Sequence, residues 1–201
     1  MQRFQFLLPL LFCLSCASAQ PSDMKPLPYR QIPEMVEAPP VTGAALLARL
    51  MDGMGYRYYW ATEGLRAEDL AYRFGETNRP ASETLEHLYN LSRTIRLAVE
   101  RKPNVRPLPA APESFEEQRR ITLENIQFVA DHMRTAQESD LANYEMIFQR
   151  GDNQSVVPVW NLMNGPIADA LTHIGQITAS RRASGNPQHP GVNVFVGKTR
   201  E

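Results

Sequence analysis

Hydrophobic side chains recur at intervals of three and four residues in four stretches of the chain, which is the period of amphipathic helices. We expect helices over residues 41–65, 80–100, about 114–137, and from near Pro158 to the stop signal Gly185-Asn186-Pro187. The buried stripe of the second helix is expected to contain Leu85, Leu88, Ser92, Ile95 and Val99. No clear strand-like alternation accompanies these patterns. The sequence therefore predicts an all-α fold, a four-helix bundle.

Helix start and stop signals support these boundaries. Pro80 can open the second helix because the first helical N–H needs no partner. Ser114 followed by Glu117 predicts a capping box at the start of the third helix. Gly165-Pro166 predicts a kink in the last helix. Residues 138–157 remain ambiguous, because LANYEMIFQ could form one or two helical turns and RGDNQS reads as a turn.

The N-terminal stretch MQRFQFLLPLLFCLSCASAQ has the layout of a cleaved secretory signal. Arg3 precedes a run rich in leucine and phenylalanine, and Ala17-Ser18-Ala19 precedes Gln20. The apolar run, about a dozen residues, is short for a transmembrane helix. We expect removal of residues 1–19 and export to the periplasm or the extracellular space. The alternative is a lipid-anchored Cys16, but Cys13 stands where such signals prefer leucine, which favours simple cleavage.

The expected mature chain has one domain preceded by a leader. Residues 20–40 hold six prolines after Gln20, which predicts an extended, poorly ordered proline-rich leader. Residues 41–201 then form the helical domain, with a loop over 66–79, a proline-rich connection over 101–114 and an irregular C-terminal tail.

Composition narrows the chemistry. Both cysteines, Cys13 and Cys16, lie in the expected signal, so cleavage excludes disulfides, thiolate metal sites and cysteine nucleophiles. The remaining 20 basic and 22 acidic side chains form no basic cluster, which argues against a nucleic-acid partner. No further apolar run is long enough to span a membrane. The expected partner is an unidentified small molecule, and a homodimer is left open.

The last helix carries the candidate chemistry. Asp169 and His173 are four residues apart and lie along one edge of its apolar stripe, while His87 occupies a similar edge of the second helix. Two imidazoles and one carboxylate can bind a divalent metal and leave coordination positions open. The competing interpretation is an ordinary i,i+4 surface contact worth tenths of a kcal/mol. His132 faces inward on the third helix, either as a competing ligand or as a core histidine bonded to a neighbour; His189 lies in a loop.

The histidine in ETLEHLYNL and the run DALTHIGQITASRR followed by GNP resemble the DinB family of bacterial four-helix-bundle proteins, over about residues 46–182. Members typically hold a divalent metal, often zinc or nickel, with one histidine from the second helix and a His-x-x-x-His pair before Gly-Gln on the last. His87 and His173 match this pattern, whereas Asp169 replaces the middle histidine. The resemblance implies a site at His87, Asp169 and His173 for zinc or nickel, with iron not excluded.

Two classes of function follow. The first is an exported metal-dependent enzyme, either thiol-transferase-like, as in characterised relatives, or hydrolase-like, because small thiols are scarcer in an oxidising compartment. The second is a non-catalytic bundle that binds a ligand or protein, with a vacant or structural metal site. An open metal position facing a concave pocket would favour the enzyme.

Other residues near these positions have plain structural interpretations. Gln176 could hydrogen-bond to His173 and orient it, although a surface glutamine is the commoner case. Gly175 is expected to let a neighbouring helix approach closely, and Arg181 to place favourable charge at a helix C-terminus. The aromatic residues of the first helix could wall a pocket, but core packing is favoured for most of them: Tyr56, Tyr58, Tyr59 and Trp60.

Overall fold

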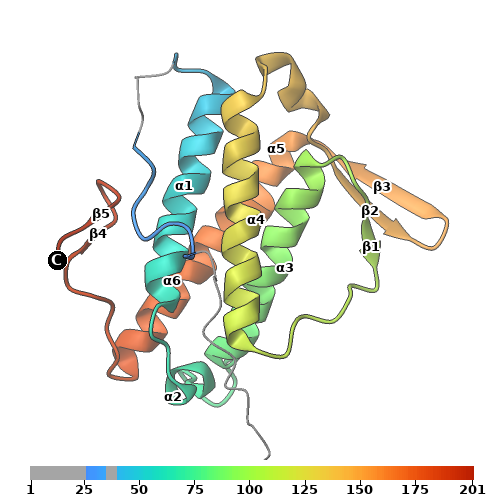
Figure 1. Cartoon of the computed structure of the whole chain (residues 1–201). Helices are drawn as coiled ribbons and strands as arrows, with labels where there is room; N and C mark the ends of the chain where they lie inside the picture. The colour runs from blue at the N-terminus through green and yellow to red at the C-terminus, as the bar shows by residue number, and fades with distance from the viewer. Residues whose placement is uncertain (1–25, 35–39) are drawn as a thin grey trace, which may run out of the picture.

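A computed structural model describes residues 26–34 and 40–201 of the chain. This part is mostly helical and also contains a small three-stranded sheet (Figure 1). The predicted helical content is therefore confirmed, but the prediction of an all-α fold is wrong. The expected signal peptide, residues 1–19, lies outside the described residues.

Four long helices pack side by side. α1 contacts α4 and α6, and α3 contacts the same two helices from the other side (Figure 1). Their apolar stripes meet in one core, because each helix buries the residues that recur at three and four. The four helices are α1 (Gly43–Thr62), α3 (Ala81–Val99), α4 (Phe115–Thr135) and α6 (Ala168–Ala183).

The predicted starts of α3 and α4 are confirmed, but the predicted capping box of α4 forms only in part. Pro80 is the N-cap of α3, and Ser114 is the N-cap of α4, where its hydroxyl accepts a hydrogen bond from the Glu117 N–H at 3.1 Å. The Glu117 carboxylate, however, accepts from the Arg120 guanidinium at 2.6 and 2.9 Å. The second half of the predicted capping box is thus replaced by an ion pair one turn along the helix.

The sheet consists of β1 (Asn104–Arg106), β2 (Met146–Arg150) and β3 (Asn153–Val157). β1 runs parallel to β2, and β2 pairs antiparallel with β3. The predicted turn at RGDNQS joins β2 to β3, but helical turns occur only before the hairpin, in η1 (Glu138–Asn143). The sequence carries no clear signal for these strands, because β3 is largely exposed and polar and β1 is only three residues long inside a proline-rich connection.

Two segments expected to be irregular contain short elements. The 66–79 stretch holds α2 (Ala67–Ala71), whose Asp69 is buried. The C-terminal tail holds a small hairpin of β4 (Val192–Asn193) and β5 (Lys198–Thr199). These elements are too short to show a period in the sequence, and their contacts with the long helices stabilise them.

Part of the proline-rich leader is packed against the helices, in contrast to the expected poor order. Tyr29 and Ile32 are buried in the core, and the Trp60 indole donates to the Arg30 carbonyl at 3.1 Å. Gly55 makes this docking feasible, because a Cβ there would overlap the Tyr29 ring. Composition predicted disorder, whereas the burial of Tyr29 and Ile32 and the hydrogen bond to Arg30 offset the entropy of ordering the segment.

The last helical region begins at Pro158, as expected, and has three parts: α5 (Val159–Leu162), the π-helical η2 (Met163–Ile167) and α6. Gly165 has non-helical backbone angles, and Pro166 follows it inside the helical run. Proline lacks an N–H and crowds the carbonyl four residues earlier, so the regular ladder is interrupted here. The predicted kink is confirmed, three residues before Asp169.

Candidate metal centre

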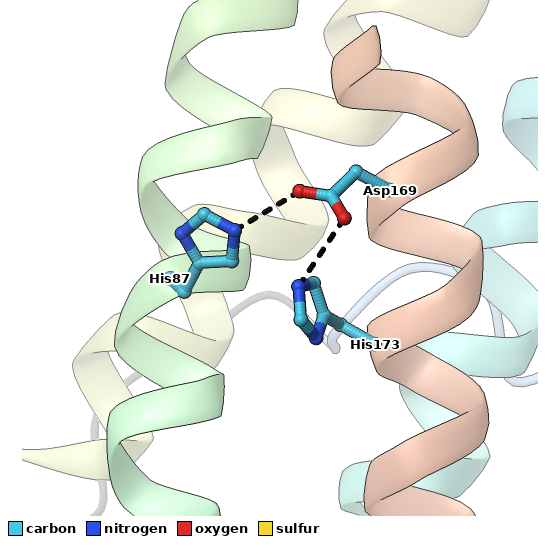
Figure 2. Close-up of side chains that lie close together, drawn as sticks. All are labelled: His87, Asp169 and His173. Atoms are coloured by element: carbon cyan, nitrogen blue, oxygen red, sulfur yellow. Dashed lines mark hydrogen bonds and ion pairs between the residues drawn. The ribbon is translucent and has the colours of Figure 1, made fainter. Parts of the chain in front are cut away.

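The three candidate ligands project from neighbouring helices into one groove. His87 comes from α3, and Asp169 and His173 come from successive turns of α6 (Figure 2). Each lies at the edge of a buried stripe, so its side chain is neither in the core nor fully in solvent. The side chains are 35% (His87), 45% (Asp169) and 20% (His173) exposed.

Asp169 contacts both histidines. Its Oδ2 lies 3.0 Å from His87 Nε2, and its Oδ1 lies 3.3 Å from His173 Nε2. The two imidazole rings are perpendicular, with centroids 4.8 Å apart. One ligand atom from each residue falls within 4.8 Å of the others, so the structure brings the three expected ligands together at one place. Among the described residues, this is the one group of three such side chains that could hold a metal ion.

Gln176 fixes the orientation of His173. Its Oε1 lies 2.7 Å from His173 Nδ1, so Nδ1 donates and carries a proton. In the neutral ring, Nε2 then presents a lone pair toward the Asp169 carboxylate. Two acceptors 3.3 Å apart repel one another unless a cation, either a second proton or a metal ion, lies between them. The donor set therefore fits a divalent cation, and the outer hydrogen bond is of the kind that orients histidine ligands.

Two hollows flank the cluster along the groove. One, which we call the loop-side hollow, has a volume of about 590 Å³ and is lined by His87, His173, Gln176 and the α2–α3 loop. The other, the sheet-side hollow, measures about 520 Å³ and is lined by Asp169, η2, α3 and the sheet. Both volumes are in the range of small-molecule sites. The cluster thus borders concave space on both sides, so a small molecule could reach it.

The other two histidines described by the structure lie elsewhere. His132 Nε2 is 3.0 Å from the Tyr144 hydroxyl, and its ring stacks on Phe128. It is a histidine bonded to a neighbour rather than a competing ligand. His189 packs against Trp60 with ring centroids 5.6 Å apart. Neither residue belongs to the cluster.

The remaining candidates are structural. The aromatic residues of α1 are buried in the core, as favoured. Arg181 is buried and donates to the carbonyls of Trp60 and Ala61 at 2.8 and 3.2 Å, so it caps the end of α1 as well as lying near its own helix terminus. The expectation for Gly175 is wrong, because a Cβ there would meet nothing within 4 Å. In the described part of the chain, no helix comes close enough to touch a side chain added at Gly175.

Sequence reasoning overlooked Arg106, which lines the sheet-side hollow beside Asp169. It precedes a proline within the 101–114 connection, where no periodicity marks it. Only the parallel pairing of β1 with β2 brings Arg106 to the groove. No local signal could have revealed its position.

Comparison with known protein families found no matching family, and comparison with curated proteins found no matching relative. Within the described residues, no helix combines the length and apolarity needed to cross a bilayer.

Proposed function

We propose that this chain is an exported, DinB-like four-helix-bundle protein that acts as a divalent-metal-dependent enzyme of the hydrolase type. The observation that supports it best is the convergence of His87, Asp169 and His173 from two helices, beside hollows large enough for a substrate. The pairwise packing of α1, α3, α4 and α6 is compatible with such a bundle, to which the small sheet is an addition.

The chain's own residues would divide the work. His87 and His173 supply neutral imidazole nitrogens, and Asp169 supplies an anionic oxygen that faces both. Gln176 keeps the His173 proton on Nδ1, which leaves Nε2 available as a ligand. A divalent metal in this donor set would act as a Lewis acid and lower the pKa of a bound water or thiol. The carboxylate reduces the site's net charge from +2 to +1, so this acidification is weaker than with three histidines.

The choice between water and thiol rests on the compartment. Export places the protein where small thiols are scarce, which favours water and therefore hydrolysis over thiol transfer. A non-catalytic binding protein is the alternative class. The partial exposure of all three ligands and the adjoining hollows support the enzyme, because side chains would fill this edge in a purely structural site.

Calorimetric titration with Zn²⁺ and Ni²⁺ tests the proposal. Wild type should bind one ion per chain. Asp169→Ala should lose more than about a hundredfold in affinity, since even outer partners of a metal ligand are worth about 10- to 100-fold. Asp169→His should retain the fold and bind zinc or nickel as well as, or better than, wild type. His132→Ala is the matched control, because this histidine is bonded to Tyr144 away from the cluster.

Equal binding by wild type, Asp169→Ala and Asp169→His, or no binding by any of them, would show that Asp169 is not a ligand. The export component has its own test, the intact mass of the exported protein. A chain beginning at Gln20 supports it, whereas a chain that retains Met1 or begins at a lipidated Cys16 contradicts simple cleavage.

A further inference from the structure

The sheet-side hollow has an unusual lining for a surface depression. Its floor and walls are largely apolar, from Leu91, Met146, Phe148, Val157 and Pro166. Asp169 also lines this hollow, and Arg106 is the one basic residue among the described residues that line it. The other polar lining residues are neutral: Thr94, Asn161 and Asn164. An apolar site with a few polar groups at its margin is the usual anatomy of a small-molecule pocket.

Arg106 is half-buried and held in place by its strand. Its guanidinium lies over the Phe148 ring, with Cζ 5.9 Å from the ring centroid, so the side chain is directed along the apolar wall. Among residues 26–34 and 40–201, no carboxylate lies within ion-pair distance of Arg106. The cation therefore has donors to offer to a ligand.

A second arginine reinforces this charge. Arg106 is paired in register with Arg150 on β2, so the two side chains lie on the same face of the sheet. Like charges directly opposite one another destabilise a sheet. Both residues also line a shallow depression that continues from the sheet-side hollow past Phe148. Arg150 is exposed, so water screens its charge, and Arg106 is the arginine that would contribute most to holding an anion here.

We propose that the sheet-side hollow binds an organic anion whose apolar body lies on Phe148 and Val157 and whose oxyanion, a carboxylate or a phosphate, is held by Arg106. Guanidinium groups bind both oxyanions through paired N–H donors. The opposite end of such a molecule would lie beside Asp169. As a substrate subsite this assignment rests on the proposed function, whereas anion binding itself does not.

The loop-side hollow is a poorer match for the same ligand. Its polar lining includes Thr77, Asn78, Thr84 and Gln176, which are neutral. Its one arginine among the described lining residues, Arg79, is exposed on the loop before α3. An exposed arginine contributes less to anion binding, because water screens its charge.

Binding can be mapped by nuclear magnetic resonance on ¹⁵N-labelled protein, with and without Zn²⁺. The probes are 3-phenylpropionate, phenyl phosphate and the neutral 3-phenylpropionamide. We expect at least one anion to shift the amides of Leu91, Phe148 and Val157 in the zinc-free protein, and the neutral amide to bind about tenfold more weakly. Comparing the two anions distinguishes a carboxylate from a phosphate ligand.

Substitutions then locate the charge. Arg106→Gln should weaken the preferred anion by about tenfold, Arg106→Lys should weaken it less, and both spectra should retain wild-type dispersion. Arg182→Gln, at the exposed end of α6, is the matched control and should leave affinity within about twofold. A loss confined to Arg79→Gln, or shifts confined to Thr77 and Asn78, would move the anion site to the loop-side hollow and overturn the proposal.

The metal titration separates this inference from the proposed function. Arg106-dependent anion binding by a protein that binds no zinc would support the subsite and contradict the metalloenzyme. Zinc binding together with anion affinity that is unchanged by Arg106→Gln would support the metal site and contradict the anion subsite. Anion binding that requires zinc and ignores Arg106 would mean that the carboxylate or phosphate coordinates the metal, which also overturns the subsite.

Discussion

Two aspartates, Asp69 on α2 and Asp169 on α6, use their carboxylates in contrasting ways. Asp69 on α2 is 1% exposed and accepts hydrogen bonds from the Arg66 guanidinium and backbone, from the Ser184 hydroxyl and from the Asn186 amide. Asp169 on α6 is 45% exposed, and the ionisable groups within reach are the two imidazoles of His87 and His173.

The difference separates a structural carboxylate from an available one. The Arg66 side chain, followed by Ser184 and Asn186, holds the pKa of Asp69 well below its ordinary value. Its two carboxylate oxygens accept hydrogen bonds from Arg66, Ser184 and Asn186, and these bonds join α2 to the end of α6. The partners of Asp169 are the side chains of His87 and His173 rather than an arginine, so no permanent cation is bound to its oxygens. Burial with fixed donors lets the Asp69 carboxylate stabilise the fold, whereas partial exposure leaves the Asp169 carboxylate accessible to a ligand.

The largest expected effect on stability is at Asp69. Asp69→Asn should lower the free energy of unfolding by about 2–3 kcal/mol, because the new amide group would place its own N–H₂ against donors that now bind a carboxylate. Urea unfolding followed by circular dichroism at neutral pH measures this loss. A loss below about 0.5 kcal/mol would show that this network contributes little.

The pH dependence of that loss sharpens the comparison. Because the folded pKa of Asp69 lies below its unfolded value of about 3.9, its contribution is present above that pH and is lost as the pH falls toward the folded pKa. The stability difference between wild type and Asp69→Asn should stay constant from about pH 5 to 8 and shrink below about pH 4. Urea midpoints across this range test it. A difference that grows in acid would contradict the assigned direction.

A smaller effect, on metal affinity, is expected at Gln176. Gln176→Ala removes the acceptor that keeps the proton on Nδ1 of His173, so zinc affinity should fall by about 10- to 100-fold. Calorimetry measures it, with Gln127→Ala on α4, which contributes nothing to the cluster, as control. Unchanged affinity would mean that His173 needs no outer partner.

The smallest effect on the free energy of unfolding is expected for Asp169→Asn, the same substitution as Asp69→Asn made at the other aspartate. Asp169→Asn, at a partly exposed i,i+4 position, should change the stability of the metal-free protein by less than about 0.5 kcal/mol. The same urea experiment applies. A loss equal to that of Asp69→Asn would show that the histidine contacts hold α3 to α6, and the contrast between the two aspartates would disappear.

Much of this protein could be predicted from its sequence alone. The four long helices, the cap at Ser114, the kink at Gly165-Pro166 and the edge positions of His87, Asp169 and His173 all follow from spacing within a single helix. Such signals are local, because a helix repeats every 3.6 residues and turn residues act on their immediate neighbours.

The tertiary structure decided the rest. The pairing of β1 with β2, the docking of Tyr29 against Gly55, the capping of α1 by Arg181 and the arrival of Arg106 at the groove each join distant segments. No periodicity marks such contacts, since they depend on which surfaces meet once the core has formed. The sequence could place His87 and Asp169 on the edges of two helices. Only the packing of those helices brought His87 Nε2 to 3.0 Å from Asp169 Oδ2.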